Sequence, residues 1–588
     1  MRADQFVLQT HTGGAGVTVG IQSTGVASLA TIQQRGELPA NVQVFTPNGE
    51  SSTALADEGT ALLEEVHAVA PAAGLAFCGP NTFVEYISCM QQLIRARATI
   101  LVDDMIYFGQ DLMSAANTDT EAVESLLARN PSVALFTVAG NYNGSYWEGE
   151  YTPVSLASQG LPALSCPLSS GTQTDTYAAE FGSSPSEQLT VSQAGTFPLV
   201  FAWADPANAN VSRFDVYWSN DADPAQSGCF STAGVNGNVI SPSVTLTAGT
   251  YTLSVATPDV SSAGKFLKLW VGGDGLTFLS TATPGGIISA QAYAFGAITI
   301  GAVNGADGIG DQIEKFSSVG PLSLVFPTPA TVQAPVLVAP DGINVDAAGT
   351  YFASLLFADG NFYGTSAAVP NAGAVAALLR AAFPELTVPQ LVQALTSGAV
   401  QLGATVPDNT FGYGRIDAMS ALAILPGPTM TALPDTTIDA GTSTPPLAFS
   451  VSGTGSLRFQ VASSNPSLVP ARLALVGAPG ISIAPSGCGV RVTTCTVMIT
   501  AAAGAGGTTT VTLDALDGAN RSASAAMTVT VNPASPSGTP PSSARLRAAP
   551  QTWGDGAFGG LELAVLALLA GTSGLGRMMR QAQPPHEP

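Results

Sequence analysis

The chain has 588 residues, of which 46% are hydrophobic and only 10% are charged. Its formal net charge of −22 at pH 7 argues against nucleic acid and anionic membrane surfaces as partners. The low charge density also separates the chain from acidic disordered proteins. The length exceeds that of one domain, and 63 glycines and 41 prolines indicate many turns and strands. We therefore expect several folded domains.

Six cysteines fall into three local pairs, Cys78/Cys89, Cys166/Cys229 and Cys488/Cys495. An even number paired in this way predicts three disulfides and an oxidising compartment, with other connectivities and six free thiols as alternatives. The three histidines and the absence of Cys-x-x-Cys give no sign of a zinc site, so we expect no metal and no cofactor. Residues 1–14 lack the segments of a secretory signal, so we expect the chain to begin inside a mature domain.

The first part of the chain alternates short apolar strands with helices. We expect strands at 16–21, 74–78, 98–102 and 133–139, and helices at 57–70, 83–95 and 121–128. This alternation predicts a parallel sheet with helices on both faces, which is a three-layer α/β fold. The pattern resumes at 297–302 and continues to about 425, where Pro426-Gly427-Pro428 cannot extend a helix.

Two regions carry strand patterns without helix signals. Residues 164–282 interrupt the α/β domain and predict an inserted β-sandwich, which divides that domain into 1–163 and 283–425. Residues 429–532 resemble an immunoglobulin-like module of the kind appended to bacterial exoproteins. Residues 533–556 are rich in Pro, Ser and Ala and predict an extended linker.

The C-terminal tail has a different composition from the rest. Residues 557–576 contain a single charge, Glu562, and are just long enough to cross a membrane. Arg577 and Arg580 would then stay on the cytoplasmic side. A Gly-rich patch followed by an apolar helix and a basic end resembles the GlyGly-type sorting tails of Gram-negative bacteria. This resemblance implies an exported surface protein with a membrane helix at 557–580; the alternative is a weakly amphipathic terminal helix.

The most informative segment is Gly364-Thr365-Ser366, four residues before Pro370 and a long Ala/Leu-rich run. The run has an apolar face at helical spacing, which predicts a buried helix with Ser366 at its N-terminus. Free N–H groups and the helix dipole favour negative charge there. Such a position suits a nucleophilic hydroxyl whose reaction passes through an oxyanion. The alternative is a serine that merely caps a core helix.

Gly-Thr-Ser-x-x-x-Pro also resembles the nucleophile segment of the subtilisin-like serine proteases (subtilases, of the subtilisin/sedolisin superfamily). Further segments resemble that family and follow in its order: 138–141, 316–321, 339–342 and 411–417. The resemblance covers residues 16–422 without the insert and implies the subtilase fold. It also implies that Ser366 is the nucleophile and that the Asn141 amide stabilises the oxyanion, a contribution of roughly 3–4 kcal/mol.

The sequence departs from the family at the other two catalytic positions. Ser23 stands where the family has its orienting aspartate, at the end of the first strand. Glu58, in Asp57-Glu58-Gly59-Thr60, stands where the family has its histidine. None of the three histidines is placed to reach Ser366, so the Ser-His-Asp triad is absent and this resembles a divergent bacterial branch.

A carboxylate can act as the base for a serine when burial raises its pKa. The sedolisins resemble this arrangement, with Glu in the His position and an Asp one turn later, where this chain has Leu62. Asp103 and Asp104 end the strand that lies beside the first strand in this fold. We therefore expect the Asp104 carboxyl group to occupy the space that the Ser23 side chain, in the position of the family aspartate, leaves unfilled. We also expect Asp104 to share a proton with Glu58. The alternative is that both aspartates form a solvated strand end.

Two functions follow from these residues. The first is an exported, surface-anchored and monomeric serine endopeptidase, which cleaves protein or peptide substrates through an acyl-enzyme on Ser366 with Glu58, Asp104 and Asn141. The second is a catalytically inactive subtilase-like surface protein that acts as a binding or adhesion module. For the enzyme we expect Glu58 within hydrogen-bonding reach of Ser366 and activity that extends to about pH 5 or lower.

Overall fold

The computed structural model describes most of the chain up to residue 534. The described residues are 1–46, 57–114, 117–168, 171–205, 211–235, 237–273, 275–278, 283–287, 289–347, 361–490, 493–504 and 506–534. The predicted terminal helix at 557–580 lies outside them, as does almost all of the predicted linker. Within the described residues no helix is long and apolar enough to span a membrane.

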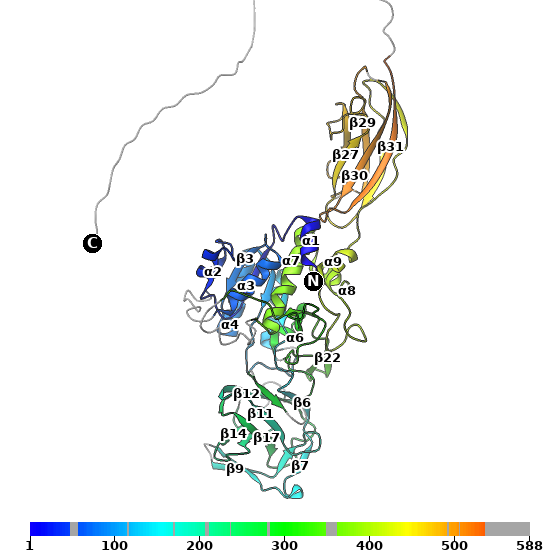
Figure 1. Ribbon diagram of the computed structural model, residues 1–588. Helices are drawn as coiled ribbons and strands as arrows, with labels where there is room; N and C mark the ends of the chain where they lie inside the picture. The colour runs from blue at the N-terminus through cyan, green and yellow to red at the C-terminus, as the bar shows by residue number, and fades with distance from the viewer. Residues whose placement is uncertain are drawn as a thin grey trace, which may run out of the picture. The chain divides into compact units, whose positions relative to one another are not determined.

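The α/β part is built on a seven-stranded sheet in which all neighbouring strands are parallel (Figure 1). The strand order is β2-β3-β1-β4-β5-β20-β23. The bounds are β1 (Thr18–Gln22), β2 (Gln43–Phe45), β3 (Gly74–Cys78), β4 (Ala98–Asp103), β5 (Ala134–Val138), β20 (Ala297–Asn304) and β23 (Leu337–Asp341). The predicted parallel sheet is thereby confirmed.

Helices cover both faces of this sheet. The helices are α1 (Ala3–Thr10), α2 (Leu29–Arg35), α3 (Glu58–Val69), α4 (Phe83–Arg95), α5 (Thr118–Arg129), α6 (Ala290–Tyr293), α7 (Thr365–Ala382), α8 (Val388–Ser397) and α9 (Ala418–Ile424). Strand β4 shows the two faces: Ile100 and Val102 join the core with α3 and α7, whereas Leu101 joins the core with α4 and α5. Successive side chains of a strand point to opposite faces, so the three-layer arrangement follows.

An inserted β-domain separates β5 from β20 in the chain. One of its sheets holds β7 (Pro153–Ser155), β10 (Tyr177–Ala179), β11 (Glu187–Val191), β13 (Asp215–Asn220), β14 (Ser227–Ser231), β17 (Gly249–Thr257) and β19 (Leu276–Phe278). A second holds β6 (Tyr146–Glu150), β12 (Gly195–Trp203), β15 (Val239–Ile240), β16 (Ser243–Leu246) and β18 (Phe266–Val271). The neighbouring strands within both sheets are antiparallel, and side chains of both share one core. The sheets begin at β6, which precedes residue 164, the predicted start of the insert.

A buried lysine connects the inserted β-domain to the α/β part. Lys268 on β18 is 1% exposed, and its Nζ donates to the carbonyl oxygens of Leu112 (3.1 Å) and Ser323 (2.8 Å). It also donates to the Tyr293 hydroxyl at 3.1 Å, and burial lowers the pKa of Lys268 to about 8. Ser323 belongs to a short hairpin of β21 (Leu322–Leu324) and β22 (Ala330–Val332). Three hydrogen bonds thus satisfy the ammonium group where the two parts meet.

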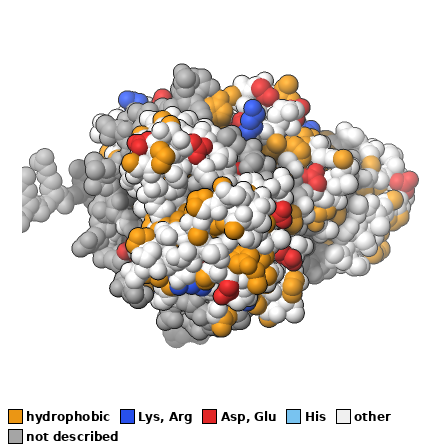
Figure 2. Space-filling model, turned by 90° about the horizontal axis from the view of Figure 1, so that it is seen from below, with side chains coloured by type: hydrophobic (Ala, Val, Ile, Leu, Met, Phe, Trp, Pro, Cys, Tyr) orange, Lys and Arg blue, Asp and Glu red, His pale blue; other side chains and the backbone are white. Residues whose placement is uncertain are grey.

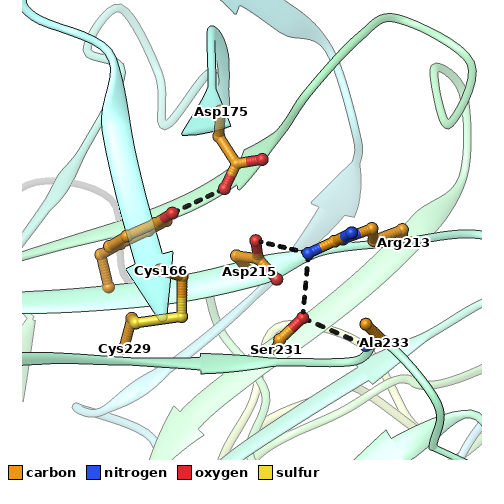
Figure 3. Close-up of a disulfide and its surroundings, with 8 residues drawn as sticks. Cys166, Asp175, Arg213, Asp215, Cys229, Ser231 and Ala233 are labelled. Atoms are coloured by element: carbon orange, nitrogen blue, oxygen red, sulfur yellow. Dashed lines mark hydrogen bonds and ion pairs between the residues drawn. A yellow bond between two sulfur atoms is a disulfide. The ribbon is translucent and has the colours of Figure 1, made fainter. Parts of the chain in front are cut away.

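All three predicted disulfides are confirmed: Cys78–Cys89, Cys166–Cys229 and Cys488–Cys495. Figure 3 shows the second one joining β14 to β8 (Leu164–Leu168), which pairs with β9 (Gly171–Asp175). Beside it, the Arg213 guanidinium pairs with the buried Asp215 at 3.3 Å. Figure 2 shows a face on which charged side chains are few and scattered, as the composition implies.

The C-terminal β-domain has two four-stranded sheets that share one core. Its strands are β24 (Thr429–Met430), β25 (Thr436–Asp439), β26 (Leu447–Ser452), β27 (Arg458–Ser463), β28 (Gly480–Ala484), β29 (Thr494–Thr500), β30 (Gly507–Leu516) and β31 (Ser522–Asn532). The predicted all-β character is confirmed, whereas the immunoglobulin-like classification stays a prediction. A short 3₁₀ helix, η1 (Ala157–Gln159), lies in the inserted β-domain.

Candidate active site

Ser366 is the second residue of α7, as the sequence predicted. Gly364 precedes the helix with φ 119°, a left-handed backbone conformation that favours glycine. The N–H of Gly364 donates to Asp341 Oδ2 at 3.0 Å. The segment Gly364–Ser366, here called the nucleophile turn, is therefore held at a helix N-terminus, where the backbone N–H groups have no partner within the helix.

The Asn141 amide is fixed by Thr365. Asn141 follows β5, and its Oδ1 accepts hydrogen bonds from both the backbone N–H and the hydroxyl of Thr365, each at 3.0 Å. The same hydroxyl accepts from the N–H of Gly140 at 3.2 Å. A Cβ added to Gly364 would lie 3.2 Å from Asn141 Nδ2 and 3.8 Å from Ser366 Oγ. The amide N–H₂ and the serine hydroxyl therefore border the same small space.

Ser23 and Asp104 meet at the carboxyl ends of two adjacent strands. Strands β1 and β4 are parallel, with Gln22 opposite Asp103. The residues that follow them are brought together, and Ser23 Oγ donates to Asp104 Oδ2 at 2.9 Å. The contact joins residues that are 81 positions apart in the sequence. Asp104 thus lies beside the position at which subtilases carry their aspartate.

The Ser366 hydroxyl also lies close enough to Asp104 to affect the pKa of its carboxyl group. Burial raises the pKa of Asp104 well above its usual range, and the negative charge of Glu58 raises it further. The hydroxyls of Ser366 and Ser23 oppose this rise because they stabilise the ionised carboxylate. A carboxyl group with these neighbours can exchange a proton with the serine.

Glu58 is the first residue of α3, and its Oε2 accepts from the Thr24 hydroxyl at 3.4 Å. The start of the helix is anchored by Asp57, whose Oδ1 accepts from the N–H of Ser28 and the hydroxyl of Thr60, both at 2.7 Å. Because the charge of Glu58 acts on Asp104, the two carboxyl groups are neighbours. Direct contact between Glu58 and Ser366 stays a prediction.

Asp103 is not a solvated strand end, so that alternative was wrong. Its side chain is fully buried, and burial raises its pKa to about 7. It accepts hydrogen bonds from the hydroxyls of Thr137 (2.7 Å) and Tyr86 (3.2 Å) and from the N–H of Met105 (3.0 Å). Strand alternation directs Asp103 away from Asp104, which explains why only Asp104 reaches the serine.

His67 lies on α3 and is half-buried, which lowers its pKa. Its Nδ1 has no hydrogen-bond partner among the residues that the structure describes. Those residues also contain no group of three or more His, Cys, Asp or Glu side chains that could hold a metal ion.

Three residues near the nucleophile turn were missed by the sequence reasoning. These are Thr365, which orients Asn141, and two buried acids, Glu65 and Asp341. Thr365 belongs to the Gly-Thr-Ser motif, and nothing in the sequence indicates that its hydroxyl contacts Asn141 and Gly140. Only Glu65 gave a sign in the sequence, because it is an acidic residue at a buried position of the amphipathic helix α3.

Residues 235–414 match the family model Peptidase_S8, the subtilase family. The chain therefore contains a subtilase domain, the class of the subtilisin-like serine proteases, as the resemblance predicted. The match begins within the inserted β-domain and includes Ser366. Glu58, Asp104 and Asn141 lie before residue 235, outside the match, so their roles are part of the proposal below.

Several solved structures are also similar to the chain. The Clostridium perfringens CspB protease has a TM-score of 0.46 at 15% identity, covering 72% of this chain and 96% of that one. MycP1 from Mycobacterium smegmatis has a TM-score of 0.36 at 16% identity, covering 72% of this chain and 82% of that one. The serine protease of Aeromonas sobria has a TM-score of 0.36 at 14% identity, covering 89% of this chain and 87% of that one. No curated protein matches the chain. Because these similarities are distant, the assignment rests on the family match and the motifs.

Proposed function

We propose that this subtilase is a serine endopeptidase that uses a pair of carboxyl groups, rather than a histidine, as its base. The observation that carries the proposal is the place of Asp104, which accepts a hydrogen bond from Ser23 and lies where the Ser366 hydroxyl and the charge of Glu58 both act on its carboxyl group. Asp104 and Glu58 are both partly buried, and two adjacent carboxyl groups share one proton because ionising both at close range is costly. The singly protonated pair leaves one carboxylate free to accept the serine proton.

In the first half of the reaction, Ser366 Oγ attacks the carbonyl carbon of the scissile peptide bond and its proton passes to Asp104. The carbonyl oxygen becomes an oxyanion beside the Asn141 amide and the N-terminus of α7, both of which stabilise negative charge. The proton then moves to the leaving nitrogen, the C–N bond breaks, and an acyl-enzyme forms. A water molecule attacks that ester, and the proton returns to Ser366 through the same carboxylate.

The cellular setting is also part of the proposal. Three disulfides support an exported protein, because an oxidising compartment preserves them. Surface anchoring, a monomeric state and protein or peptide substrates are proposed with it. The anchoring rests only on the composition of residues 557–580.

The proposal is tested by labelling Ser366 with a fluorophosphonate probe between about pH 4 and 8. Ser366→Ala is the control, and hydrolysis of an unstructured protein substrate is followed in parallel. We expect labelling that depends on Ser366 and persists at about pH 5, because a carboxylate base stays available below the usual titration range of histidine. A rate that falls off near about pH 6.5 would contradict a carboxylate base. A folded protein without any labelling would favour the inactive binding module.

A further inference from the structure

The turn between β30 and β31 of the C-terminal β-domain packs against the α/β part. This turn, residues 517–521 and here called the docking turn, has the sequence Asp-Gly-Ala-Asn-Arg. Its Ala519 is fully buried and belongs to the hydrophobic core that contains α7, not to the core of its own domain. A Cβ added to Gly518 would lie 1.6 Å from the carbonyl oxygen of Ala382, the last residue of α7. The docking turn is therefore in close contact with another domain.

The docking turn meets the C-terminal ends of three helices. These are α1, which ends at Thr10, α7, which ends at Ala382, and α9, which ends at Ile424. The last four carbonyl groups of a helix have no partner within it, and the helix dipole gives this end a partial negative charge. Side chains that donate hydrogen bonds or carry a positive charge are therefore favoured there. The docking turn supplies two such side chains, Asn520 and Arg521.

Asn520 binds the end of α1. Its Nδ2 donates to the carbonyl oxygens of Gln9 (3.0 Å) and Thr10 (3.3 Å). In the opposite direction, Gln9 Nε2 donates to the carbonyl oxygen of Ala519 at 3.4 Å. Asn520 has a φ of 59°, a left-handed conformation that asparagine adopts more readily than most residues. One asparagine thus shapes the docking turn and satisfies two carbonyl groups of the other domain.

Arg521 binds the end of α9 and the connecting segment, residues 425–428, that joins the two domains. Its Nη1 donates to the carbonyl oxygens of Leu422 (3.1 Å) and Leu425 (2.7 Å), and its Nη2 donates to that of Pro426 (3.2 Å). The guanidinium is fixed by Asp517, whose buried carboxylate accepts from Arg521 Nε at 2.7 Å. The connecting segment is therefore held by hydrogen bonds from the domain that follows it.

We propose that the docking turn is an intramolecular interaction surface whose partner is the α/β part, and that it makes the C-terminal β-domain a fixed extension of that part. Domains joined only by a linker move independently by default. Here the donors lie in one domain and the carbonyl groups that they satisfy lie in the other. Undocking would expose Ala519 and break the hydrogen bonds of Asn520 and Arg521 together, so the connecting segment opens only when the whole contact opens. This inference does not depend on the proposed chemistry of Ser366.

The experiment is limited proteolysis of the full chain with a broad-specificity protease. All proteins carry Ser366→Ala, so that the chain itself cannot contribute to cleavage, and cuts within residues 422–431 are mapped by mass spectrometry. In Gly518→Ala the added Cβ collides with the carbonyl oxygen of Ala382, whereas the turn itself accepts alanine because Gly518 lacks a positive φ. We expect this variant to be cut at the connecting segment about tenfold faster or more, because cleavage follows the population of the open form.

A second variant tests the hydrogen bonds without adding bulk. Asn520→Asp keeps the size of the side chain and its tolerance of a left-handed backbone, but it replaces the donor to Gln9 and Thr10 by a carboxylate at a helix C-terminus. We expect faster cleavage of the connecting segment here as well. Arg472→Gln is the matched control, because Arg472 Nε donates to the carbonyl oxygen of Pro479 within its own domain at 3.1 Å. Its cleavage rate should equal that of the parent.

The fragments show what the docking turn does. A released C-terminal fragment that resists further cleavage would support the proposal, because the domain then stays folded after it has undocked. Cuts within β30 or β31 in both variants would overturn it, since the turn would then be needed for the fold of its own domain. An equal cleavage rate of the connecting segment in the parent and both variants would overturn it too, as would an equal acceleration in Arg472→Gln.

Discussion

At the scale of single residues, the chemistry depends on which carboxyl group takes the serine proton. The sequence alone favoured Glu58, because it occupies the position of the family histidine. In the structure, the Ser366 hydroxyl acts on Asp104 and lowers the pKa of its carboxyl group, whereas burial and the charge of Glu58 raise that pKa. Neighbouring carboxyl groups lose their protons in two steps, and the first step lies nearer to the ordinary carboxyl range. Activity is therefore expected to survive in mild acid.

Two isosteric variants assign the roles. We expect Asp104→Asn to slow the labelling of Ser366 by about 10²- to 10⁴-fold, which is the usual contribution of a general base. Glu58→Gln removes a negative charge, so the pKa of Asp104 falls and the acid limb of the rate profile moves to lower pH. The measurement is the labelling rate against pH, with Asp103→Asn as a control for a buried acid that faces away. The reverse pattern, with Glu58→Gln inactive and Asp104→Asn only shifted, would make Glu58 the base.

At the scale of elements, the N-terminus of α7 and the segment after β5 form one unit. Thr365 connects them, because its N–H and hydroxyl both donate to Asn141 Oδ1. The backbone at Gly364 adopts a φ of 119°, a conformation that residues with a Cβ atom rarely adopt. The orientation of the Asn141 amide, the proposed oxyanion donor, is thus determined by the start of a helix more than 200 residues further along the chain.

Gly364→Ala tests this unit. The added Cβ would lie 3.2 Å from Asn141 Nδ2 on a backbone that disfavours alanine, so we expect acylation to slow by about 10²-fold or more, as after loss of an oxyanion donor. Gly36→Ala is the control, since Gly36 also has a positive φ (85°) but a Cβ there meets nothing within 4 Å. The labelling rate and the melting temperature are measured for both. Equal loss of rate in the two variants would show that the effect is general backbone strain.

At the scale of the whole molecule, the inserted β-domain has its own core and its own covalent link. Its sheets share a hydrophobic core separate from those of the α/β part, and the Cys166–Cys229 disulfide closes a long segment of chain. Lys268 connects the domain to the α/β part through three hydrogen bonds. We therefore expect loss of the Cys166–Cys229 disulfide to destabilise the inserted β-domain without a direct effect on the chemistry of Ser366.

The two disulfides of the β-domains allow a matched comparison. Cys166 and Cys229 are separated by 63 positions, and Cys488 and Cys495 by 7. From loop-closure entropy we expect replacing the first pair by serine to cost about 4 kcal/mol of unfolding free energy, and the second about 2.5 kcal/mol. Denaturant unfolding followed by tryptophan fluorescence reports on the first, because Trp203 and Trp270 are buried in the inserted β-domain. Equal losses of unfolding free energy would show that loop length is not the deciding factor. We expect Ser366 to be labelled in native buffer in both variants.

Much of the fold followed from the sequence because its signals are local. Strand and helix periodicity predicted the parallel sheet, and the Gly-Thr-Ser motif predicted that Ser366 begins a buried helix. Cysteines that follow one another along the chain predicted the bridges. The start of the inserted β-domain was less evident, because β6 is a short strand whose role depends on its pairing with β18.

Tertiary structure alone decided which acids surround the serine. Asp104 meets Ser23 because β1 and β4 are adjacent and parallel, and Asp103 turns away because side chains alternate along a strand. Local patterns determine which elements form, whereas the pKa values of buried carboxyl groups depend on neighbours that only folding brings together.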